Sequence, residues 1–395
     1  MQTKPKLRFK DKNGNAYPEW KEFKIKDIGN ISMCKRVFKE QTSSKGEIPF
    51  YKIGTFGKTP DAYISRKLFQ ELKTKYSYPQ IGAILISASG TIGRTVEYKG
   101  EDAYFQDSNI IWINHDNKIK DKFLKLLLQN TDWDKVVEGS TIKRLYNNNL
   151  LKIKVPLPCI DEQEKIAGFL SKVDELINEC EGEVKDLEEQ KKGLMQKIFS
   201  QQIRFKDSNK NPYPDWEEKV MSDILNEYCK KNSIANQYPV LTSSKQGLML
   251  QTEYYSGENR ITEKDNIGFN IIPPNYITYR SRSDDGLFTF NINNLGVTGM
   301  VSTYYPVFST NYNNLFVMTY LNINKNNLFK YAVGSSQKVL SLNELKKVKI
   351  KLPCLEEQEK IAKVLSKIYE LIEEKKALLS DWQQFKKGLL QQMFV

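Results

Sequence analysis

Acidic side chains in the first third of the sequence have the spacing of a catalytic metal site. Asp61 follows a proline and precedes Glu71 and Lys73, an order found in nucleases whose carboxylates hold a divalent cation against a phosphodiester. The order is loose enough to arise by chance in a chain rich in glutamate and lysine. We expect Asp61 in a turn and residues 68–72 in a helix, whereas such carboxylates must project from neighbouring strands. A stand-alone metal-dependent nuclease is therefore kept as an alternative only.

Two other catalytic motifs are incomplete. Residues 54–59 end like a phosphate-binding P-loop, but Lys52 occupies the place of its first glycine. Residues 211–214 and 272–275 contain Asn-Pro and Pro-Pro-Asn but lack the order of a methyltransferase target-base motif, and no glycine-rich loop opens a βαβ unit. The sequence therefore predicts a protein that is not an enzyme and has no metal or cofactor of its own.

Histidine and cysteine chemistry has few residues to draw on. His115 is the only histidine, so a zinc site or a histidine-based triad has one possible location, and we expect this residue on the surface. The five cysteines are scattered and form no Cys-x-x-Cys pair. Residues 1–10 lack the apolar core of a secretory signal, and no apolar run is long enough to span a membrane. These features predict reduced thiols and a cytoplasmic location.

The charge balance favours nucleic acid as a partner. With 60 Lys and Arg against 48 Asp and Glu, the 395-residue chain carries a net charge of +12. Six loops combine cations, which contact phosphates, with short polar or planar side chains, which read base edges. They are residues 42–45, 87–94, 139–144, 242–246, 279–285 and 334–338. The candidate DNA-binding residues are Ser44, Lys45, Ser89, Thr91, Arg94, Ser140, Thr141, Lys143, Arg144, Ser244, Lys245, Arg280, Arg282, Ser335, Gln337 and Lys338.

Structural roles compete with base contact in these loops. Gly90 and Gly93 are typical of a tight turn, and Ser140 with Thr141 is typical of a cap on the following segment. Arg280 and Arg282 are two positions apart, so on a strand they would share one face. Arginine is the side chain that best matches the two acceptors of guanine.

The chain contains an internal repeat. Residues 8–20 recur as residues 204–216 with nine of thirteen positions identical, and residues 159–177 recur as 354–372 with thirteen of nineteen identical. The middles, about 29–138 and 225–333, differ except for Thr-Ser-Ser-Lys at 42–45 and 242–245. A shared frame with two different inserts suggests that two different things are recognised at related positions, although drift of unconstrained loops would also produce it.

Two long helices are expected after the breaks at residues 156–158 and 353. Apolar residues recur with a spacing near 3.5 and charges fill the other faces, which indicates a coiled coil. Each helix of ~37 residues would be ~55 Å long. We predict that the two helices pair antiparallel; packing on a domain or on a partner is the alternative. The stripe residues predicted to matter for docking of partners are Leu176, Ile177, Leu187, Leu371, Ile372 and Phe385.

Each middle is expected to be an α+β domain with short strands. Apolar runs predict strands at residues 81–87, 109–114, 276–279, 299–302 and 314–318. Short helices are expected at 121–129 and around 321–333. We predict four segments: a globular domain at 1–158, a helix at 159–200, a second domain at 201–353 and a second helix at 354–395.

The repeat resembles the specificity subunits of type I restriction–modification systems. The resemblance rests on the Tyr-Pro-x-Trp segments at 17–20 and 213–216, the Gly-Thr-Ile-Gly turn at 90–93, and Glu-Gln-Glu-Lys-Ile-Ala at 162–167 and 357–362. It implies two target-recognition domains that read a bipartite, non-palindromic site in double-stranded DNA. The long helices would form a spacer, on which two methyltransferase subunits and the restriction subunits assemble. S-adenosylmethionine, ATP and Mg²⁺ would bind to those partner subunits.

One departure from the family pattern and two alternatives accompany this prediction. The second middle has no clear Gly-Thr-Ile-Gly copy, which puts an equivalent loop there in doubt. Besides the nuclease built on Asp61, Glu71 and Lys73, a third possibility is a coiled-coil adaptor whose basic middles bind protein or RNA. Cleavage by the isolated chain would distinguish the nuclease, and sequence-selective duplex binding would distinguish the adaptor.

Overall fold

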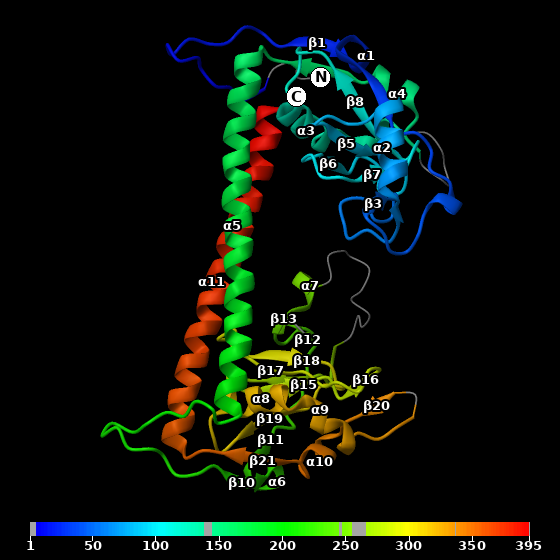
Figure 1. Ribbon diagram of the computed structural model, residues 1–395. Coiled ribbons are helices and arrows are strands. Elements are labelled where there is room, and N and C mark those ends of the chain that lie inside the picture. Colours follow the sequence, from blue (N-terminus) through cyan, green and yellow to red (C-terminus); the bar gives the residue numbers. More distant parts are fainter. Residues whose placement is uncertain (1–4, 138–143, 245–246, 255–265, 336, 395) are drawn as a thin grey trace. The chain divides into compact units, whose positions relative to one another are not determined.

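The computed structural model describes residues 5–137, 144–244, 247–254, 266–335 and 337–394 (Figure 1). Contacts divide the chain into two compact units, of which unit 1 comprises residues 1–181 and 377–395 and unit 2 comprises residues 182–376. Both units mix helices and sheets, as the sequence predicts for an α+β protein. Within the described ranges, no helix has the combination of length and apolar character that crossing a bilayer requires.

Unit 1 is built on a four-stranded antiparallel sheet with the order β2-β8-β5-β6. The strands are β2 (Gly29–Met33), β8 (Ile110–His115), β5 (Ile84–Ser87) and β6 (Thr95–Glu97). All four residues of β5 are buried, which explains its continuous apolar run Ile-Leu-Ile in place of an alternating pattern. Helix α3 (Asp121–Gln129), whose bounds match the predicted helix, packs against β5 and β6.

A second layer with its own core completes unit 1. It contains β3 (Ile48–Tyr51), β4 (Tyr63–Ile64), β7 (Tyr104–Phe105) and helix α2 (Arg66–Lys75). Large aromatic side chains such as Phe50, Phe69 and Tyr104 fill this core, separately from the one beneath the four-stranded sheet. We call this layer, residues 34–78 together with residues 98–105, the outer layer of unit 1.

Unit 2 repeats the sheet of unit 1 strand for strand. Its order is β11-β19-β15-β17, formed by β11 (Leu225–Glu227), β19 (Val307–Thr310), β15 (Ile277–Tyr279) and β17 (Phe290–Ile292). Helix α8 (Asn314–Ile323) contacts β17 and β19 and takes the place that α3 has in unit 1. The shared sheet therefore extends into the middles, where the sequences of the two halves no longer match.

The frame around each sheet is also repeated. In unit 1, β1 (Lys21–Lys24) pairs with β9 (Lys154–Leu157), and in unit 2, β10 (Glu217–Val220) pairs with β21 (Lys349–Leu352). Two short helices accompany each pair. They are α1 (Ile25–Ile28) and α4 (Asn147–Lys152) in unit 1, and α6 (Met221–Ile224) and α10 (Leu342–Leu345) in unit 2.

The outer layer of unit 2 differs from that of unit 1. It consists of the hairpin β12 (Leu241–Ser244) and β13 (Gly247–Leu250), the short helix α7 (Gln251–Tyr254), and the pair β14 (Asn270–Ile272) and β18 (Gly299–Val301). Its small core is aliphatic and includes Leu241, Leu248 and Ile272. The divergence of the two middles in sequence thus has its structural counterpart in two unlike outer layers.

The long helices α5 (Ile160–Phe199) and α11 (Leu355–Met393) contribute to both units, and their neighbouring segments are antiparallel in each. In unit 1, Lys386 pairs with Asp174 at 2.5 Å and Gln383 donates to Glu181 at 3.3 Å. In unit 2, Lys375 pairs with Glu183 and Lys191 lies over the ring of Tyr369. The predicted antiparallel pairing of the helices is therefore confirmed within each unit.

The predicted apolar stripe needs a correction at three positions, of which Phe385 is 49% exposed. Leu176 and Leu371 were expected to face the partner helix, but they are 39% and 41% exposed. Their neighbours Ile177 and Ile372 are 9% and 2% exposed. At 3.6 residues per turn, only one of two adjacent residues faces the buried side of the helix, and here it is the second residue of each pair. The sequence places two apolar residues side by side at these positions and so could not decide between them.

One predicted strand was wrong. Residues 314–318 read as a strand, yet they begin α8, because the Asn313 side chain accepts a hydrogen bond from the Phe316 amide and caps the helix. The helix expected around residues 321–333 is instead the end of α8 followed by α9 (Lys325–Leu328) and the 3-10 helix η3 (Phe329–Tyr331). The strands expected at 81–87, 109–114, 276–279 and 299–302 are confirmed as β5, β8, β15 and β18.

Candidate nucleic-acid interface

Two predicted DNA-reading loops occupy the same position in the two units. In unit 1, residues 88–94 connect the paired strands β5 and β6, and in unit 2, residues 280–289 connect the corresponding strands β15 and β17. Both connections close an antiparallel hairpin at the same place in the sheet order. The missing Gly-Thr-Ile-Gly copy therefore does not remove the loop from unit 2.

A glycine packed under an aromatic ring fixes each loop. Gly93 has φ +81° and Gly286 has φ +73°, a conformation that favours glycine. A Cβ atom on Gly93 would collide with the indole of Trp133, and one on Gly286 would collide with the ring of Phe329. Both rings belong to short 3-10 helices, η2 (Trp133–Lys135) and η3, that follow the sheet-packing helices. Gly93 was expected to serve a tight turn, and its positive φ is consistent with that role.

Three segments of unit 1 meet at the start of its loop. The Ser89 hydroxyl donates to Asn109 Oδ1 at 2.8 Å, and the Leu145 amide donates to the Ala88 carbonyl at 2.9 Å. Arg144 forms an isolated bridge with Ser89, and its Nη2 lies 3.5 Å from the Ser108 carbonyl oxygen. The structure thus brings together Ser89 and Arg144, which come from two separate predicted loops.

The rest of this loop is held by its own backbone. Buried Ser87 donates its hydroxyl to the Thr91 carbonyl and accepts the Arg94 amide at 2.9 Å. The Arg94 guanidinium donates to the Phe56 carbonyl at 2.7 Å. Thr91 is exposed at the tip. Arg94 is therefore half-buried and holds the loop against residues 52–57, so its predicted DNA contact would compete with this bond.

The corresponding segments of unit 2 meet in the same way. Strand β16 (Arg282–Ser283) pairs with β20 (Lys338–Val339), and the Leu340 amide donates to the Ser281 carbonyl at 2.9 Å, as Leu145 does to Ala88 in unit 1. The Gln337 amide donates to Asp284 at 2.9 Å. Lys338 donates to the Gly334 carbonyl and lies over the Phe329 ring. Two predicted loops of unit 2 thus form one surface.

The two arginines of this surface do not share a strand face. Arg280 follows the end of β15, and Arg282 begins the separate strand β16, because Ser281 bonds through its amide and its hydroxyl to the Tyr304 carbonyl and interrupts the strand. Both arginines are exposed. A shared face was expected only if both arginines lay on one strand, and this condition is not met.

The matched Thr-Ser-Ser-Lys segments take different structures. Ser44 and Lys45 lie in an exposed loop, and the preceding residue Ser43 forms backbone hydrogen bonds with Tyr63 of β4. Ser244 ends strand β12, and its carbonyl accepts the Asn291 side-chain amide at 2.9 Å. Ser335 is exposed beside Gly334. Four further candidates lie outside the described residues: Ser140, Thr141, Lys143 and Lys245.

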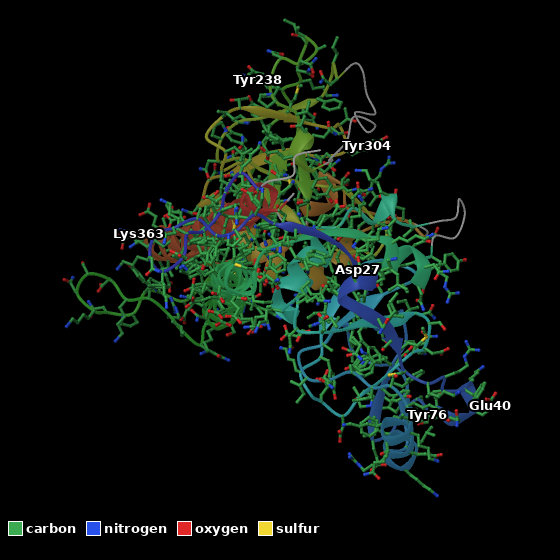
Figure 2. All side chains as sticks on the ribbon, turned by 90° about the horizontal axis from the view of Figure 1, so that it is seen from above. Asp27, Glu40, Tyr76, Tyr238, Tyr304 and Lys363 are labelled. Atoms are coloured by element: carbon green, nitrogen blue, oxygen red, sulfur yellow. The ribbon has the colours of Figure 1, made fainter. Side chains whose placement is uncertain are left out.

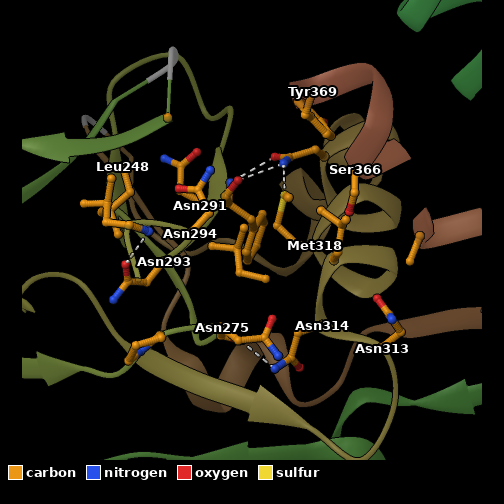
Figure 3. Close-up of a pocket in the computed structure, with 18 of the residues that line it drawn as sticks. Leu248, Asn275, Asn291, Asn293, Asn294, Asn313, Asn314, Met318, Ser366 and Tyr369 are labelled. Carbon is orange, nitrogen blue, oxygen red and sulfur yellow. Dashed lines mark hydrogen bonds between the residues drawn. The ribbon is translucent and has the colours of Figure 1, made fainter. Parts of the chain in front are cut away.

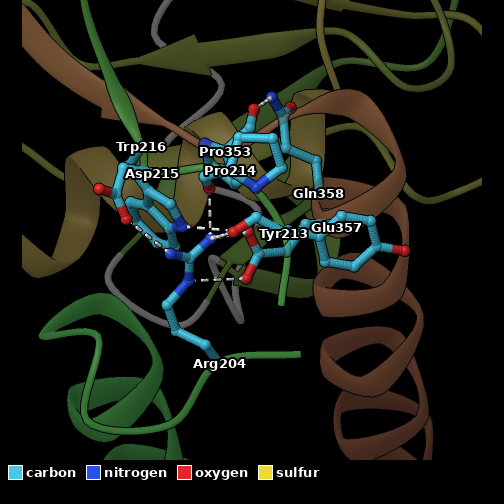
Figure 4. Close-up of polar contacts among 8 residues, drawn as sticks. All are labelled: Arg204, Tyr213, Pro214, Asp215, Trp216, Pro353, Glu357 and Gln358. Carbon is cyan, nitrogen blue, oxygen red and sulfur yellow. Dashed lines mark hydrogen bonds and ion pairs between the residues drawn. The ribbon is translucent and has the colours of Figure 1, made fainter. Parts of the chain in front are cut away.

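The residues that the chain repeats most faithfully form a buried polar cluster in each unit. In unit 2, Glu357 is fully buried and accepts hydrogen bonds from Arg204 Nε and Nη2 and from Trp216 Nε1 (Figure 4). Arg204 Nη2 also donates to the Pro214 carbonyl at 2.6 Å. The bond to Glu357 raises the pKa of the Arg204 guanidinium, which therefore stays charged.

Unit 1 contains the same cluster. Arg8 donates through Nε and Nη2 to the buried Glu162, and Trp20 Nε1 donates to the same carboxylate at 3.1 Å. Sequence reasoning treated these residues only as marks of a family and missed their role. The arginine, tryptophan and glutamate of this cluster are identical in the two repeats, and this identity was the signal that could have indicated a shared structural role.

The glutamine of the repeated motif ties the long helix to the sheet domain. Gln163 donates to the carbonyls of Lys118 and Pro158 and accepts the Lys120 amide, at the residue that precedes α3. In unit 2, Gln358 donates to the Pro353 carbonyl and accepts the amide of Asn313, which precedes α8. The glutamine of the repeated motif therefore positions the long helix against the sheet domain in each unit.

A cavity of about 1610 Å³ lies within unit 2 between α8, β17 and the first part of α11 (Figure 3). Its many asparagines are bound to the protein: Asn291 to Ser243 and Ser244, Asn293 to the Ile272 carbonyl, and Asn314 to the Asn275 carbonyl. Its charged lining consists of Lys191, Lys325, Lys363, Glu253, Glu359, Glu370 and Glu373. Acidic and basic side chains are thus nearly balanced in this lining.

The acidic residues considered for cleavage are not assembled into a site. Asp61 pairs with Lys52 at 2.9 Å, and Glu71 pairs with Lys75 one turn along α2. Among the residues with described positions, no group of three or more His, Cys, Asp and Glu could hold a metal ion. The segment that resembles a P-loop is followed by β4 and not by the helix that a phosphate loop requires.

His115 is not the surface residue expected. Its side chain is 14% exposed, and its Nε2 lies 2.9 Å from Asp121 Oδ1, while Nδ1 lies 2.7 Å from the Asp116 carbonyl. It therefore joins the end of β8 to the start of α3.

Comparison with known proteins gives consistent matches. Two stretches, residues 17–189 and 213–380, match the type I restriction modification DNA specificity domain. A putative type I restriction enzyme specificity subunit of Haemophilus influenzae is 55% identical over 159 residues, which are 40% of this chain and 41% of that protein. The putative MjaX specificity subunit of Methanocaldococcus jannaschii is 26% identical over 405 residues, covering 95% of this chain and 93% of that protein.

Solved structures share the fold. The S subunit of a type I restriction-modification system from M. genitalium has a TM-score of 0.63 at 16% identity, with 99% of both chains covered. A chain from a structure of type I R-M complex assembly and conformational transition has a TM-score of 0.53 at 14% identity, covering 96% of this chain and 98% of that chain. With a repeated frame, a repeated sheet and two copies of the matched domain, this chain belongs to the family of type I restriction-modification DNA specificity subunits.

Proposed function

We propose that this chain is the DNA-reading specificity subunit of a type I restriction–modification complex, in which each unit reads one part of a split site in double-stranded DNA. The observation that carries the proposal is an equivalent loop surface in both units. In each unit, the hairpin loop of the shared sheet pairs with the segment that precedes the last frame strand, which is β9 in unit 1 and β21 in unit 2. The unlike outer layers and loops give the two half-sites different sequences, so the whole site is not a palindrome.

The surfaces have the chemistry for this task. In unit 2, exposed Arg280 and Arg282 lie near Gln337 and Lys338, and in unit 1, Ser89 and Arg144 lie together. Cations neutralise phosphates and fix the protein on the duplex, while planar amides and guanidinium groups read base edges. The remaining candidates, including Ser44, Lys45, Thr91, Ser244 and Ser335, stay predictions for the same role.

The proposal places catalysis on other subunits. In the described residues, Asp61 and Glu71 are bound to different lysines. S-adenosylmethionine, ATP and Mg²⁺ would bind to methyltransferase and restriction subunits that assemble with this chain. Of the predicted docking residues on the long helices, Leu176, Leu371 and Phe385 are exposed and Leu187 is half-buried, whereas Ile177 and Ile372 are packed within their own units. The exposed residues are the ones that could contact a partner.

Sequencing of methylated bases in cells tests the proposal. Cells that contain the partner subunits together with this chain should carry a split, non-palindromic methylated motif, and cells without this chain should lack it. Methylation that is identical in both would contradict the proposal.

A second measurement separates the nuclease alternative. The isolated chain, incubated with DNA, Mg²⁺ and ATP, should neither nick DNA nor hydrolyse nucleotide. Cleavage that disappears in Asp61→Ala would favour the nuclease instead. Salt-sensitive binding to duplexes of one sequence class distinguishes the proposal from an adaptor for protein or RNA.

A further inference from the structure

Most arginines of this chain are engaged within the protein. Of nine arginines, eight lie in the described ranges, and six of these donate to protein oxygens. The six and their acceptors are Arg8 with Glu162, Arg36 with Asp107, Arg66 with Asp102, Arg94 with the Phe56 carbonyl, Arg144 with the Ser108 carbonyl, and Arg204 with Glu357. Arg280 and Arg282 make no hydrogen bond or ion pair with a described residue.

Arg282 differs from Arg280 because an aromatic ring supports it. Its guanidinium carbon lies 4.4 Å from the centroid of the Tyr304 ring, and Tyr304 is itself 50% exposed (Figure 2). The loop carrying Tyr304 is tied to the arginine loop, since the Ser281 amide and hydroxyl both donate to the Tyr304 carbonyl, at 3.1 and 2.8 Å. A guanidinium stacked on a ring keeps its N–H edge free for a bidentate contact.

The carboxylates of Asp284 and Asp285 lie in the same loop and accept hydrogen bonds from donors other than Arg282. Asp284 accepts the Gln337 side-chain amide at 2.9 Å, and Asp285 accepts the Ser283 hydroxyl at 2.7 Å and the Leu287 amide at 3.0 Å. Both acids are thereby held by other donors. Strand pairing of Arg282 with Val339 also fixes the backbone from which the side chain starts. Less conformational freedom is then lost when the guanidinium binds, which favours affinity and specificity.

We propose that Arg282, supported by Tyr304, reads a guanine in the major groove of the half-site bound by unit 2, and that Tyr304 is its positioning residue. This inference rests on the proposed function and deepens it, because it assigns one base type to one side chain. The planar fork of arginine matches guanine O6 and N7, a pair of acceptors that no other base presents in the major groove.

The test uses the complete complex with its methyltransferase partners and a pool of duplexes randomised in both half-sites. Arg282→Lys keeps the charge but removes the fork, so preference for guanine should fall at one position of the unit 2 half-site. A bidentate contact corresponds to about 5- to 150-fold discrimination, and the loss should lie in this range. Tyr304→Leu removes the ring and should weaken the preference at the same position, whereas Tyr304→Phe keeps the ring face and should preserve it.

Arg36→Lys is the matched control, because it makes the same exchange at an exposed arginine of unit 1 that pairs with Asp107, and it should leave the unit 2 half-site unchanged. The inference is overturned if Arg282→Lys selects the same motif as the unaltered chain, or if selectivity falls at every position, since either result assigns Arg282 a role other than reading one base. It is overturned equally if Tyr304→Leu has no effect on that position. Failure of the unaltered complex to select any motif would refute the proposed function itself, and is thereby distinguished from failure of this inference.

Discussion

At the scale of single residues, the polar cluster around Glu357 determines whether the frame of unit 2 holds together. The carboxylate is fully buried and takes three hydrogen bonds, two from Arg204 and one from Trp216. A buried ion pair is costly to break because the remaining charge loses its partner without regaining water. Since Arg204 keeps 22% of its side chain exposed, part of that cost is recovered by solvation.

Glu357→Gln should therefore lower the free energy of unfolding by about 2–4 kcal/mol. Urea denaturation followed by circular dichroism measures the change. Asp215→Asn is the control, because Asp215 also pairs with Arg204 but is fully exposed, and it should cost less than about 1 kcal/mol. Equal effects of the two substitutions would show that burial of Glu357 does not matter.

His115 offers a titration with a single signal, because it is the only histidine in the chain. The hydrogen bond to Asp121 raises the pKa of His115 above its ordinary value of 6.5. The protonated ring stabilises the fold, so this contribution is complete below pH 6.5 and is lost as the pH rises through the higher folded-state pKa. NMR of the ring proton should give a pKa above 6.5, and Asp121→Asn should lower it. A folded-state pKa at or below 6.5 would refute this pairing.

At the scale of elements, two adjacent residues on each long helix differ in burial, and substitutions can test this difference. Ile177→Asp would bury an unpaired carboxylate in the apolar core cluster of unit 1 and should destabilise this unit by about 3–5 kcal/mol. Leu176→Asp places the same charge on a residue that is 39% exposed and should cost about 1 kcal/mol or less. The pair Ile372→Asp and Leu371→Asp repeats the comparison in unit 2. Thermal denaturation of the four variants measures the difference. Equal melting temperatures for the two variants of a pair would contradict the assignment of one residue as buried and its neighbour as exposed.

Elements with a strong local pattern could be predicted from the sequence, and others could not. The Leu-rich segment at 121–129 forms α3 within the predicted bounds, since its 3.6-residue periodicity is sustained over two turns. The apolar run at 314–318 is too short to show a period, and Asn313, whose side chain caps the helix, decides its structure. Periodicity alone cannot distinguish a buried strand from the start of a buried helix.

The candidate site was predicted in part. Loops 87–94 and 279–285 could be identified from their residue types, because glycines, hydroxyls and arginines are frequent in DNA-reading turns. Their equivalence depends on the pairing of distant strands, which local sequence does not encode. The support of Arg282 by Tyr304 joins residues 22 positions apart and has no signature in either segment.

At the scale of the whole molecule, the repeat implies two readers that act independently. The frame of each unit carries the same strand pair, the same sheet and the same buried cluster. The parts that differ are the outer layers and the hairpin loops. If the frame only positions these parts, exchanging one middle should change one half-site and leave the other intact, because the other unit keeps all of its own contacts.

The most direct test exchanges residues 29–138 for the equivalent residues of another specificity subunit and sequences the methylated sites in cells that contain the partner subunits. The account predicts that one half-site changes to that of the donor protein while the second half-site stays the same. The reciprocal exchange of residues 225–333 should change only the second half-site. A change in both half-sites after one exchange, or a methylated sequence that stays unaltered, would contradict the account of two independent readers.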